Sequence, residues 1–214
     1  MERPSSVTSA LQWVLTNHTA RNISVVNLSL GVNSGSQDGT DQVSILVNRL
    51  VAAGVFVSVA AGNSGDSPST IFAPGTAFYA TTVGSAAVNR YGSYLSYFSS
   101  QGPVPAGPGV DFLAAGTSIR AAKSTAMPWT GTSTVWSGTS MAAPYVAGLA
   151  ALLHEKTPSH APSGTACASD PITCPIGVVP ASMTNGIEGD ISASDWFSAG
   201  VPKITSGTPW RRAR

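Results

Sequence analysis

Hydrophobic residues recur at helical spacing in two segments near the start of the chain. One predicted amphipathic helix covers residues near 5–18, and a second covers residues near 43–51 and ends at Gly54, a residue favoured just past a helix C-terminus. The apolar positions that carry this pattern are Val7, Leu11, Val14 and Leu15 in the first segment and Val43, Leu46, Val47, Leu50 and Val51 in the second. Uncharged runs rich in Ile, Val and Leu are typical of strands covered on both faces. Such runs predict strands at 23–31, 55–63 and 80–88, with shorter extended pieces at 94–103 and 111–116.

The order helix, strand, helix, strand predicts a parallel sheet with crossover helices. In sheets of this kind, ligands bind beyond the carboxyl ends of the strands. Two polar and glycine-rich segments fall at those ends, namely Ser29-Leu30-Gly31 and Gly62-Asn63-Ser64-Gly65. The pattern therefore predicts where a site would lie, but it names no reaction.

A third helix is predicted after residue 138, and its start can be argued from Pro144. Proline has no backbone N–H and is expected only in the first turn of a helix, where amides lack partners in any case. The helix should therefore begin close to Thr139 or Ser140, which places Ser140 at a helix N-terminus. The residues that follow leave no polar face as far as Pro158, and a helix that is apolar all round is expected to be buried.

Composition narrows the class of protein. The chain has 214 residues, enough for one domain with a hydrophobic core. Only 10% of its residues are charged and the net charge is +1, so nothing indicates a nucleic-acid partner or an anionic membrane. The longest uncharged apolar stretch, residues 141–153, is too short to cross a bilayer, and the first ten residues lack the apolar core of a signal peptide.

The two cysteines, Cys167 and Cys174, could form a small disulfide loop or remain free thiols. His154 and His160 lie just upstream and are residues that can bind zinc, but the spacings do not match the usual cysteine pairs of zinc sites. The carboxylates form no cluster with ligand-like spacing either. No metal site is predicted.

Three segments in this order, VVNLSLG (25–31), VAAGNSG (59–65) and SGTSMAAPYVAGLAALL (137–153), resemble the subtilisin-like serine proteases. The similarity covers residues 6–158 approximately. It implies an α/β fold of three layers, with a mainly parallel sheet and helices on both faces. Residues 1–158 would then be the C-terminal part of a subtilisin-like peptidase domain, and residues 159–214, rich in proline and without a clear period, a loop-rich C-terminal extension.

The resemblance also assigns roles to matching positions. Ser140 would attack the scissile carbonyl of a polypeptide substrate, and Asn63 would donate its side-chain amide to the oxyanion together with the backbone N–H of Ser140. The site residues implied for substrate binding are the edge segment Ser29, Leu30 and Gly31 and the pocket border Ala61 and Gly62. Each motif alone has an ordinary explanation as a turn, a cap or a strand end; their joint occurrence favours the protease.

The family's triad contains an Asp in an Asp-Ser/Thr-Gly motif and a His in a His-Gly-Thr motif, both well before the segment resembling VVNLSLG. Here the residues before Ile23 contain no Asp, and His18 lies in NHTA. The resemblance therefore implies a chain that is N-terminally incomplete, with an exposed strand edge. Such a chain alone would fold poorly and show little activity. By the same resemblance the full-length protein would be secreted, and calcium is possible.

Other functions remain open. A non-catalytic descendant could bind peptides through the Ser29–Gly31 edge without cutting them. A different serine hydrolase of the Gly-x-Ser-x-Gly type is disfavoured because Ala142 stands where the second glycine would be. The sedolisin-like relatives use an Asp for the oxyanion, so Asn63 favours the subtilisin-like side.

Overall fold

The computed structural model describes residues 4–32, 37–65, 67–90, 92–105, 109–124 and 131–156. Cys167, Cys174, His160 and the predicted extension 159–214 lie outside these residues. The elements in chain order are α1 (Pro4–Asn17), β1 (Val25–Leu28), α2 (Gln42–Ala52), β2 (Phe56–Ala60), β3 (Thr81–Asn89), β4 (Gly92–Leu95), β5 (Phe112–Ala115), β6 (Ile119–Ala122), β7 (Ser133–Trp136) and α3 (Thr139–Lys156). The predicted helices and the second and third predicted strands are confirmed to within a few residues.

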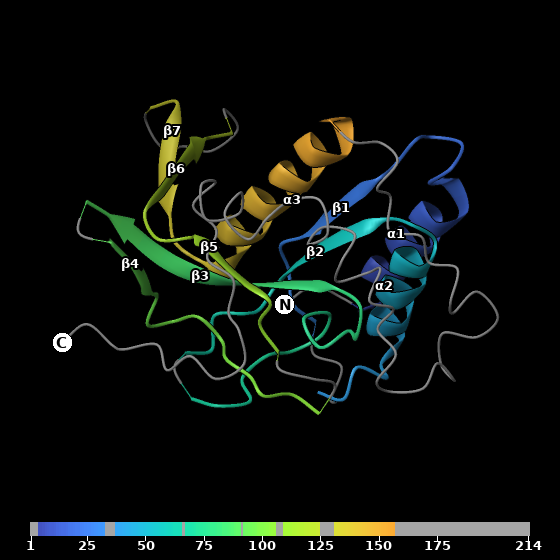
Figure 1. The fold of residues 1–214 in the computed structure, drawn as a ribbon, viewed down its shortest axis with the longest axis horizontal. Coiled ribbons are helices and arrows are strands. Elements are labelled where there is room, and N and C mark those ends of the chain that lie inside the picture. The colour runs from blue at the N-terminus through green and yellow to red at the C-terminus, as the bar shows by residue number, and fades with distance from the viewer. Residues whose placement is uncertain are drawn as a thin grey trace.

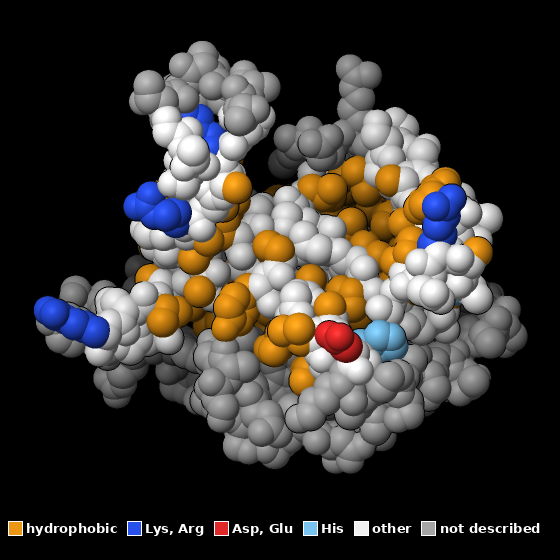
Figure 2. Space-filling model, turned by 90° about the horizontal axis from the view of Figure 1, so that it is seen from above, with side chains coloured by type: hydrophobic (Ala, Val, Ile, Leu, Met, Phe, Trp, Pro, Cys, Tyr) orange, Lys and Arg blue, Asp and Glu red, His pale blue; other side chains and the backbone are white. Residues whose placement is uncertain are grey.

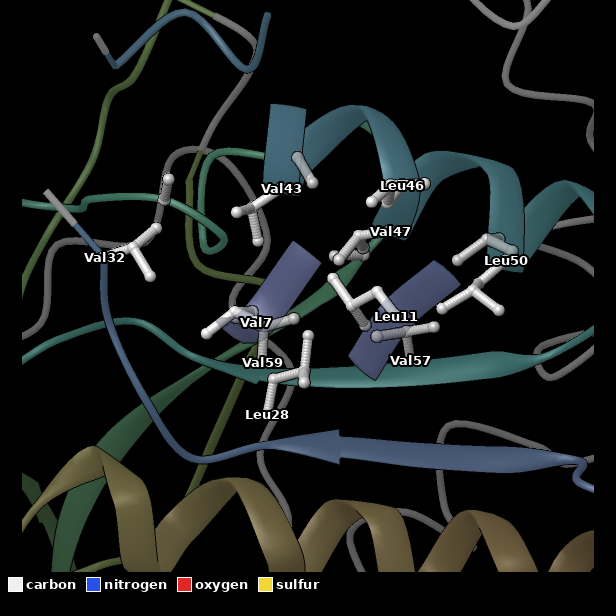
Figure 3. Packing of buried hydrophobic residues seen from close by; sticks show 14 of the residues in the cluster. Val7, Leu11, Leu28, Val32, Val43, Leu46, Val47, Leu50, Val57 and Val59 are labelled. Carbon is white, nitrogen blue, oxygen red and sulfur yellow. The ribbon is translucent and has the colours of Figure 1, made fainter. Parts of the chain in front are cut away.

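The main sheet is mostly parallel, as predicted. β1 pairs with β2, β2 with β3 and β3 with β5 in parallel, while β4 returns antiparallel to β3. Helices cover both faces, with α1 and α2 on one side of the sheet and α3 on the other (Figures 1 and 3). The three-layer α/β architecture is therefore confirmed. The β6–β7 hairpin forms a separate two-stranded antiparallel sheet that the hydrophobic pattern did not predict.

The side chains of β2 alternate between two apolar clusters, as strand geometry requires. Val57 and Val59 pack into the cluster shared with α1 and α2 (Figure 3). Phe56 and Ala60 pack into the cluster shared with α3. Between these two, the buried hydroxyl of Ser58 donates a hydrogen bond of 2.9 Å to the Ala143 carbonyl of α3. The central strand therefore fixes the position of the helix that begins at the predicted nucleophile.

One expectation about α3 is wrong. The helix was predicted to be buried all round, but Tyr145 is 46% and Leu152 is 64% exposed. The sheet covers one face of α3, and no other described element covers the opposite face. Figure 2, seen from the side on which α3 lies, shows hydrophobic side chains exposed at many places on this side of the molecule. Burial was inferred from composition, but it depends on how many layers surround the helix.

β1 is an edge strand whose only described neighbour is β2. The Phe56 N–H donates to the Ser24 carbonyl at 2.8 Å. Because hydrogen-bonding direction alternates along a parallel strand, the backbone groups of Val25 and Asn27 face the free edge. The side chain of Asn27 is exposed, although a position inside a buried strand was expected. Asn27 points to the same face of the sheet as Val25, which packs on the α3 side, and no described element covers Asn27 there.

Among the described residues, no helix is both long enough and apolar enough to cross a membrane.

Candidate active site

The C-terminal ends of β1 and β2 lie next to the start of α3. Ser29 follows β1 directly, and Ser140 is the second residue of α3. The Ser29 hydroxyl donates to the Ser140 carbonyl at 2.8 Å, and the Ser140 hydroxyl donates to the Ser29 carbonyl at 3.1 Å. Two serines that are 111 positions apart in the sequence are therefore joined by reciprocal hydrogen bonds.

Pro144 explains why this contact is possible. α3 begins at Thr139, as predicted, but Pro144 lies beyond the first turn, where it was not expected. In a regular helix the N–H of residue 144 would donate to the carbonyl of residue 140, and proline has no N–H. The hydroxyl of Ser29 supplies the missing donor to the Ser140 carbonyl. The prediction was wrong because it considered only partners within the helix.

Asn63 lies at the other side of the same turn. Its Oδ1 accepts hydrogen bonds from the backbone N–H of Thr139 at 2.9 Å and from the Thr139 hydroxyl at 3.0 Å. Since the Thr139 N–H can only donate, the atom that faces it must be the amide oxygen. The Thr139 hydroxyl in turn accepts from the Gly62 N–H at 3.1 Å. Asn63 thus serves one of the free amides at the start of α3, although 76 positions separate it from Thr139.

These bonds leave the amide nitrogen of Asn63 available as a donor. It makes no hydrogen bond to any described residue, and the Asn63 side chain is exposed. A Cβ placed on Gly138 would lie 3.2 Å from this nitrogen, so Nδ2 sits against the turn that carries Ser140. The first amides of α3 have no acceptor within the helix, and the helix dipole adds positive potential there. The arrangement suits a negatively charged oxygen near Ser140.

Two of the predicted substrate-binding residues, Ser29 and Gly62, hydrogen-bond to the start of α3, and the other three adjoin them in the chain. Leu30 packs against the cluster beneath α1 and α2, while Gly31 is exposed beside it. Ala61 is buried, and Gly62 has a φ of +110° and donates to Thr139. Gly62 also accepts from the Ser100 N–H at 2.9 Å, so the strand end is held on both sides.

Gly116 is a residue of this region that sequence reasoning did not single out. Its carbonyl accepts from the Gly138 N–H at 2.8 Å, which supports the turn before Ser140 from β5. A Cβ there would lie 2.4 Å from the Ser85 hydroxyl and 2.7 Å from the Gly138 carbonyl. Only a residue without a side chain fits, and the glycine that ends DFLAAG was the available signal.

No proton acceptor of the usual kind contacts Ser140 in the described part of the chain. His18 closes α1, where its Nδ1 lies 2.9 Å from the Leu15 carbonyl, and His154 lies further along α3. Neither hydrogen-bonds to Ser140, nor does any described Asp or Glu. No group of three or more His, Cys, Asp or Glu side chains that could hold a metal ion occurs among the described residues.

Comparison with known proteins gives consistent matches. The model of the subtilase family matches residues 3–168. Subtilisin from Bacillus pumilus is 36% identical over 155 residues, which cover 72% of this chain and 50% of that protein. Subtilisin E from Bacillus subtilis is also 36% identical, over 72% of this chain and 36% of its own length.

Solved structures show the same similarity in three dimensions. The S41 psychrophilic protease has a TM-score of 0.60 at 29% identity, over 72% of this chain and 50% of that one. A cold-adapted subtilisin-like serine proteinase has a TM-score of 0.58 at 31% identity, over 78% of this chain and 54% of that one. The chain therefore spans about half, or less, of the length of the relatives it matches.

Proposed function

Because the chain belongs to the subtilase family, we propose that it supplies the nucleophile and the oxyanion-binding side chain of a serine endopeptidase that acts on polypeptides. The observation that carries this proposal is the turn at the start of α3. There Ser140 lies at a helix N-terminus, and Asn63 is held beside the turn with its amide nitrogen unbonded to any described residue. Two separate elements thus present the two groups that an acyl transfer needs.

In the proposed reaction, the Ser140 oxygen attacks the carbonyl carbon of the scissile peptide bond. The carbonyl oxygen becomes an oxyanion that accepts hydrogen bonds from Asn63 Nδ2 and the Ser140 N–H. The C–N bond then breaks, the leaving amine takes a proton, and an ester forms on Ser140. Water cleaves this ester and regenerates the hydroxyl. The substrate would lie along the segment Ser29–Gly31 as an additional strand, held by main-chain hydrogen bonds.

The attack requires a base for the Ser140 proton, and no described His, Asp or Glu hydrogen-bonds to Ser140. We propose that the base and the carboxylate that orients it belong to a part of the protein outside this sequence. This is consistent with a chain that spans about half the length of its relatives. Secretion of the full-length protein stays a prediction.

The experiment begins with the coding sequence upstream of Met1. If it continues in frame through a His and an Asp motif, the longer protein should react with a fluorophosphonate at Ser140, as located by peptide mass spectrometry. Ser140→Ala should abolish the label. Asn63→Ala should slow turnover by about 100- to 1000-fold, the effect measured for such a donor in a subtilisin. A longer protein that cleaves peptides equally well with Ser140→Ala would refute the proposal.

A second function, peptide binding, is favoured because no described His, Asp or Glu hydrogen-bonds to Ser140. If a stop codon precedes Met1 and no label forms at Ser140, the free edge at Ser29 remains suited to binding an extended peptide without cleaving it. Peptide binding without hydrolysis would support this alternative.

A further inference from the structure

The hydroxyl of Ser140 is directed at the backbone of the segment proposed to bind substrate. It donates to the Ser29 carbonyl at 3.1 Å. A serine poised for attack would instead direct this proton to a base. The described structure therefore shows the proposed nucleophile engaged with a main-chain acceptor of its own substrate-binding edge.

The neighbouring contacts explain why the Ser29 carbonyl, rather than the Ser29 hydroxyl, receives this proton. The Ser29 hydroxyl gives its single proton to the Ser140 carbonyl, which Pro144 leaves without a helical donor. The oxygen of the same hydroxyl accepts a hydrogen bond of 2.9 Å from Asn27 Nδ2. Asn27 and Pro144 together fix the orientation of the Ser29 hydroxyl, and the Ser140 hydroxyl bonds to the carbonyl of the same residue.

The Ser29 carbonyl is also well placed to bind an extended polypeptide. The backbone groups of Val25 and Asn27 face the free edge of β1. Every second residue of a strand faces the same edge, so the backbone groups of Ser29, two residues after Asn27, face it as well. A polypeptide that adds to an edge strand binds through its own main-chain N–H groups. One such N–H would approach the oxygen that the Ser140 hydroxyl already occupies.

We propose that the Ser140 hydroxyl and a substrate main-chain N–H compete for the Ser29 carbonyl, so that polypeptide binding at this edge releases the nucleophile from its internal hydrogen bond. The inference rests on the proposed function of the edge. In this proposal the Ser140 hydroxyl blocks the Ser29 carbonyl until the N–H of a polypeptide replaces it. Neither a serine hydroxyl nor an amide titrates near neutral pH, so the competition is independent of pH between about 5 and 9.

The competition is measured by peptide binding without any catalytic readout. The probe is penta-alanine with a fluorophore at one end, whose affinity for the full chain is determined by fluorescence anisotropy. Ser140→Ala removes the competing donor and should tighten binding by about 2- to 10-fold, the net worth of one hydrogen bond. The matched control is Ser9→Ala, which also removes a serine hydroxyl bonded to a backbone carbonyl, that of Ser5, but on α1. It should leave the affinity unchanged.

A set of ester analogues of the probe, each with one amide N–H replaced by oxygen, identifies the competing donor. One analogue should bind Ser140→Ala and the unaltered chain equally, because it lacks the N–H that uses the Ser29 carbonyl. Circular dichroism checks the fold of each variant, and Ser140→Cys, whose thiol is a weak donor, repeats the test if the alanine variant is unfolded.

The outcomes separate the two proposals. Tighter binding by Ser140→Ala, lost in one ester analogue, supports the competition. Equal binding by both proteins would mean that the two lone pairs of the Ser29 carbonyl serve both donors, which overturns the competition and leaves the edge as a peptide site. Absence of binding in both would overturn the edge assignment and the competition with it.

Discussion

Replacing Gly116 by alanine should displace the turn that carries Ser140. Gly116 lies just past β5, and its carbonyl holds the Gly138 N–H at 2.8 Å. The added Cβ would lie 2.4 Å from the Ser85 hydroxyl and 2.7 Å from the Gly138 carbonyl, whereas ordinary contact begins at 3.4 Å. A side-chain hydroxyl can rotate away, but the Gly138 carbonyl is backbone and can move only with the turn.

The size of the effect follows from the packing. Ser85 and Gly116 are both buried, so no neighbouring space absorbs the methyl group. Overpacking a well-packed site by one carbon typically costs 1–3 kcal/mol, and we expect Gly116→Ala to lower the free energy of unfolding by about 2 kcal/mol. Urea denaturation followed by tryptophan fluorescence measures this, with an unchanged slope as the sign that only stability has altered.

The same substitution elsewhere provides the control. Gly148 lies in α3, and apart from its chain neighbours and the adjacent backbone of the helix no described atom lies within 4 Å of an added Cβ. Gly148→Ala should therefore stabilise the protein by up to about 1 kcal/mol through helix propensity. The opposite signs of two identical changes separate packing from any general effect of alanine.

A double variant locates the strain. Ser85→Ala removes the hydroxyl 2.4 Å from the new Cβ, but it leaves the Gly138 carbonyl at 2.7 Å. Combining it with Gly116→Ala should restore only part of the loss, with a coupling energy of about 0.5–1 kcal/mol. If Gly116→Ala is as stable as the unaltered protein to within about 0.5 kcal/mol, β5 does not support the turn as described. Full recovery in the double variant would assign the strain to Ser85 alone.

Two further predictions concern the same end of the sheet. Thr139→Ala removes the buried hydroxyl that joins Gly62 to Asn63, and the Gly62 N–H loses its acceptor. The free energy of unfolding, measured in urea, should fall by about 1–3 kcal/mol. Thr139→Ser should recover most of this loss, and equal losses in both variants would contradict a role for the hydroxyl. In hydrogen exchange followed by NMR, the amides of Val25 and Asn27 should exchange close to the unprotected rate, since they face the free edge of β1. Strong protection of both would mean that another strand, such as that of a second copy, covers the edge.

The elements whose signals are local were predicted from the sequence. α2 carries its apolar residues on one stripe, and the uncharged runs of β2 and β3 are long enough to distinguish strands from loops. The start of α3 was predicted at the observed residue, although the proline rule behind that prediction does not hold at Pro144. Ser140 and Asn63 were named because their motifs resemble a known family. The β6–β7 hairpin was missed, because its strands, IRAA and STVW, are mostly exposed and form no run rich in Ile, Val and Leu.

Other features depend on partners far away in the sequence. The exposure of Tyr145 and Leu152 on α3, and of Asn27 on β1, reflects which layers and strands are present, which no local pattern records. The position of Pro144 beyond the first turn was excluded by a rule that holds within one helix. It is accommodated because Ser29, from another element, replaces the missing hydrogen bond.

The sequence by itself determined the order of the three helices and of the parallel strands of the main sheet, and the residues at the strand ends, because periodicity and turn chemistry act over a few neighbouring positions. Only the tertiary structure decided the orientation of the site. The Asn63 oxygen is turned toward Thr139, and the Ser140 hydroxyl toward the Ser29 carbonyl, by hydrogen bonds that span 76 and 111 positions. The direction of a hydroxyl or an amide is set by whichever donor or acceptor folding brings within about 3 Å of it, and that partner is a property of the assembled sheet and helix.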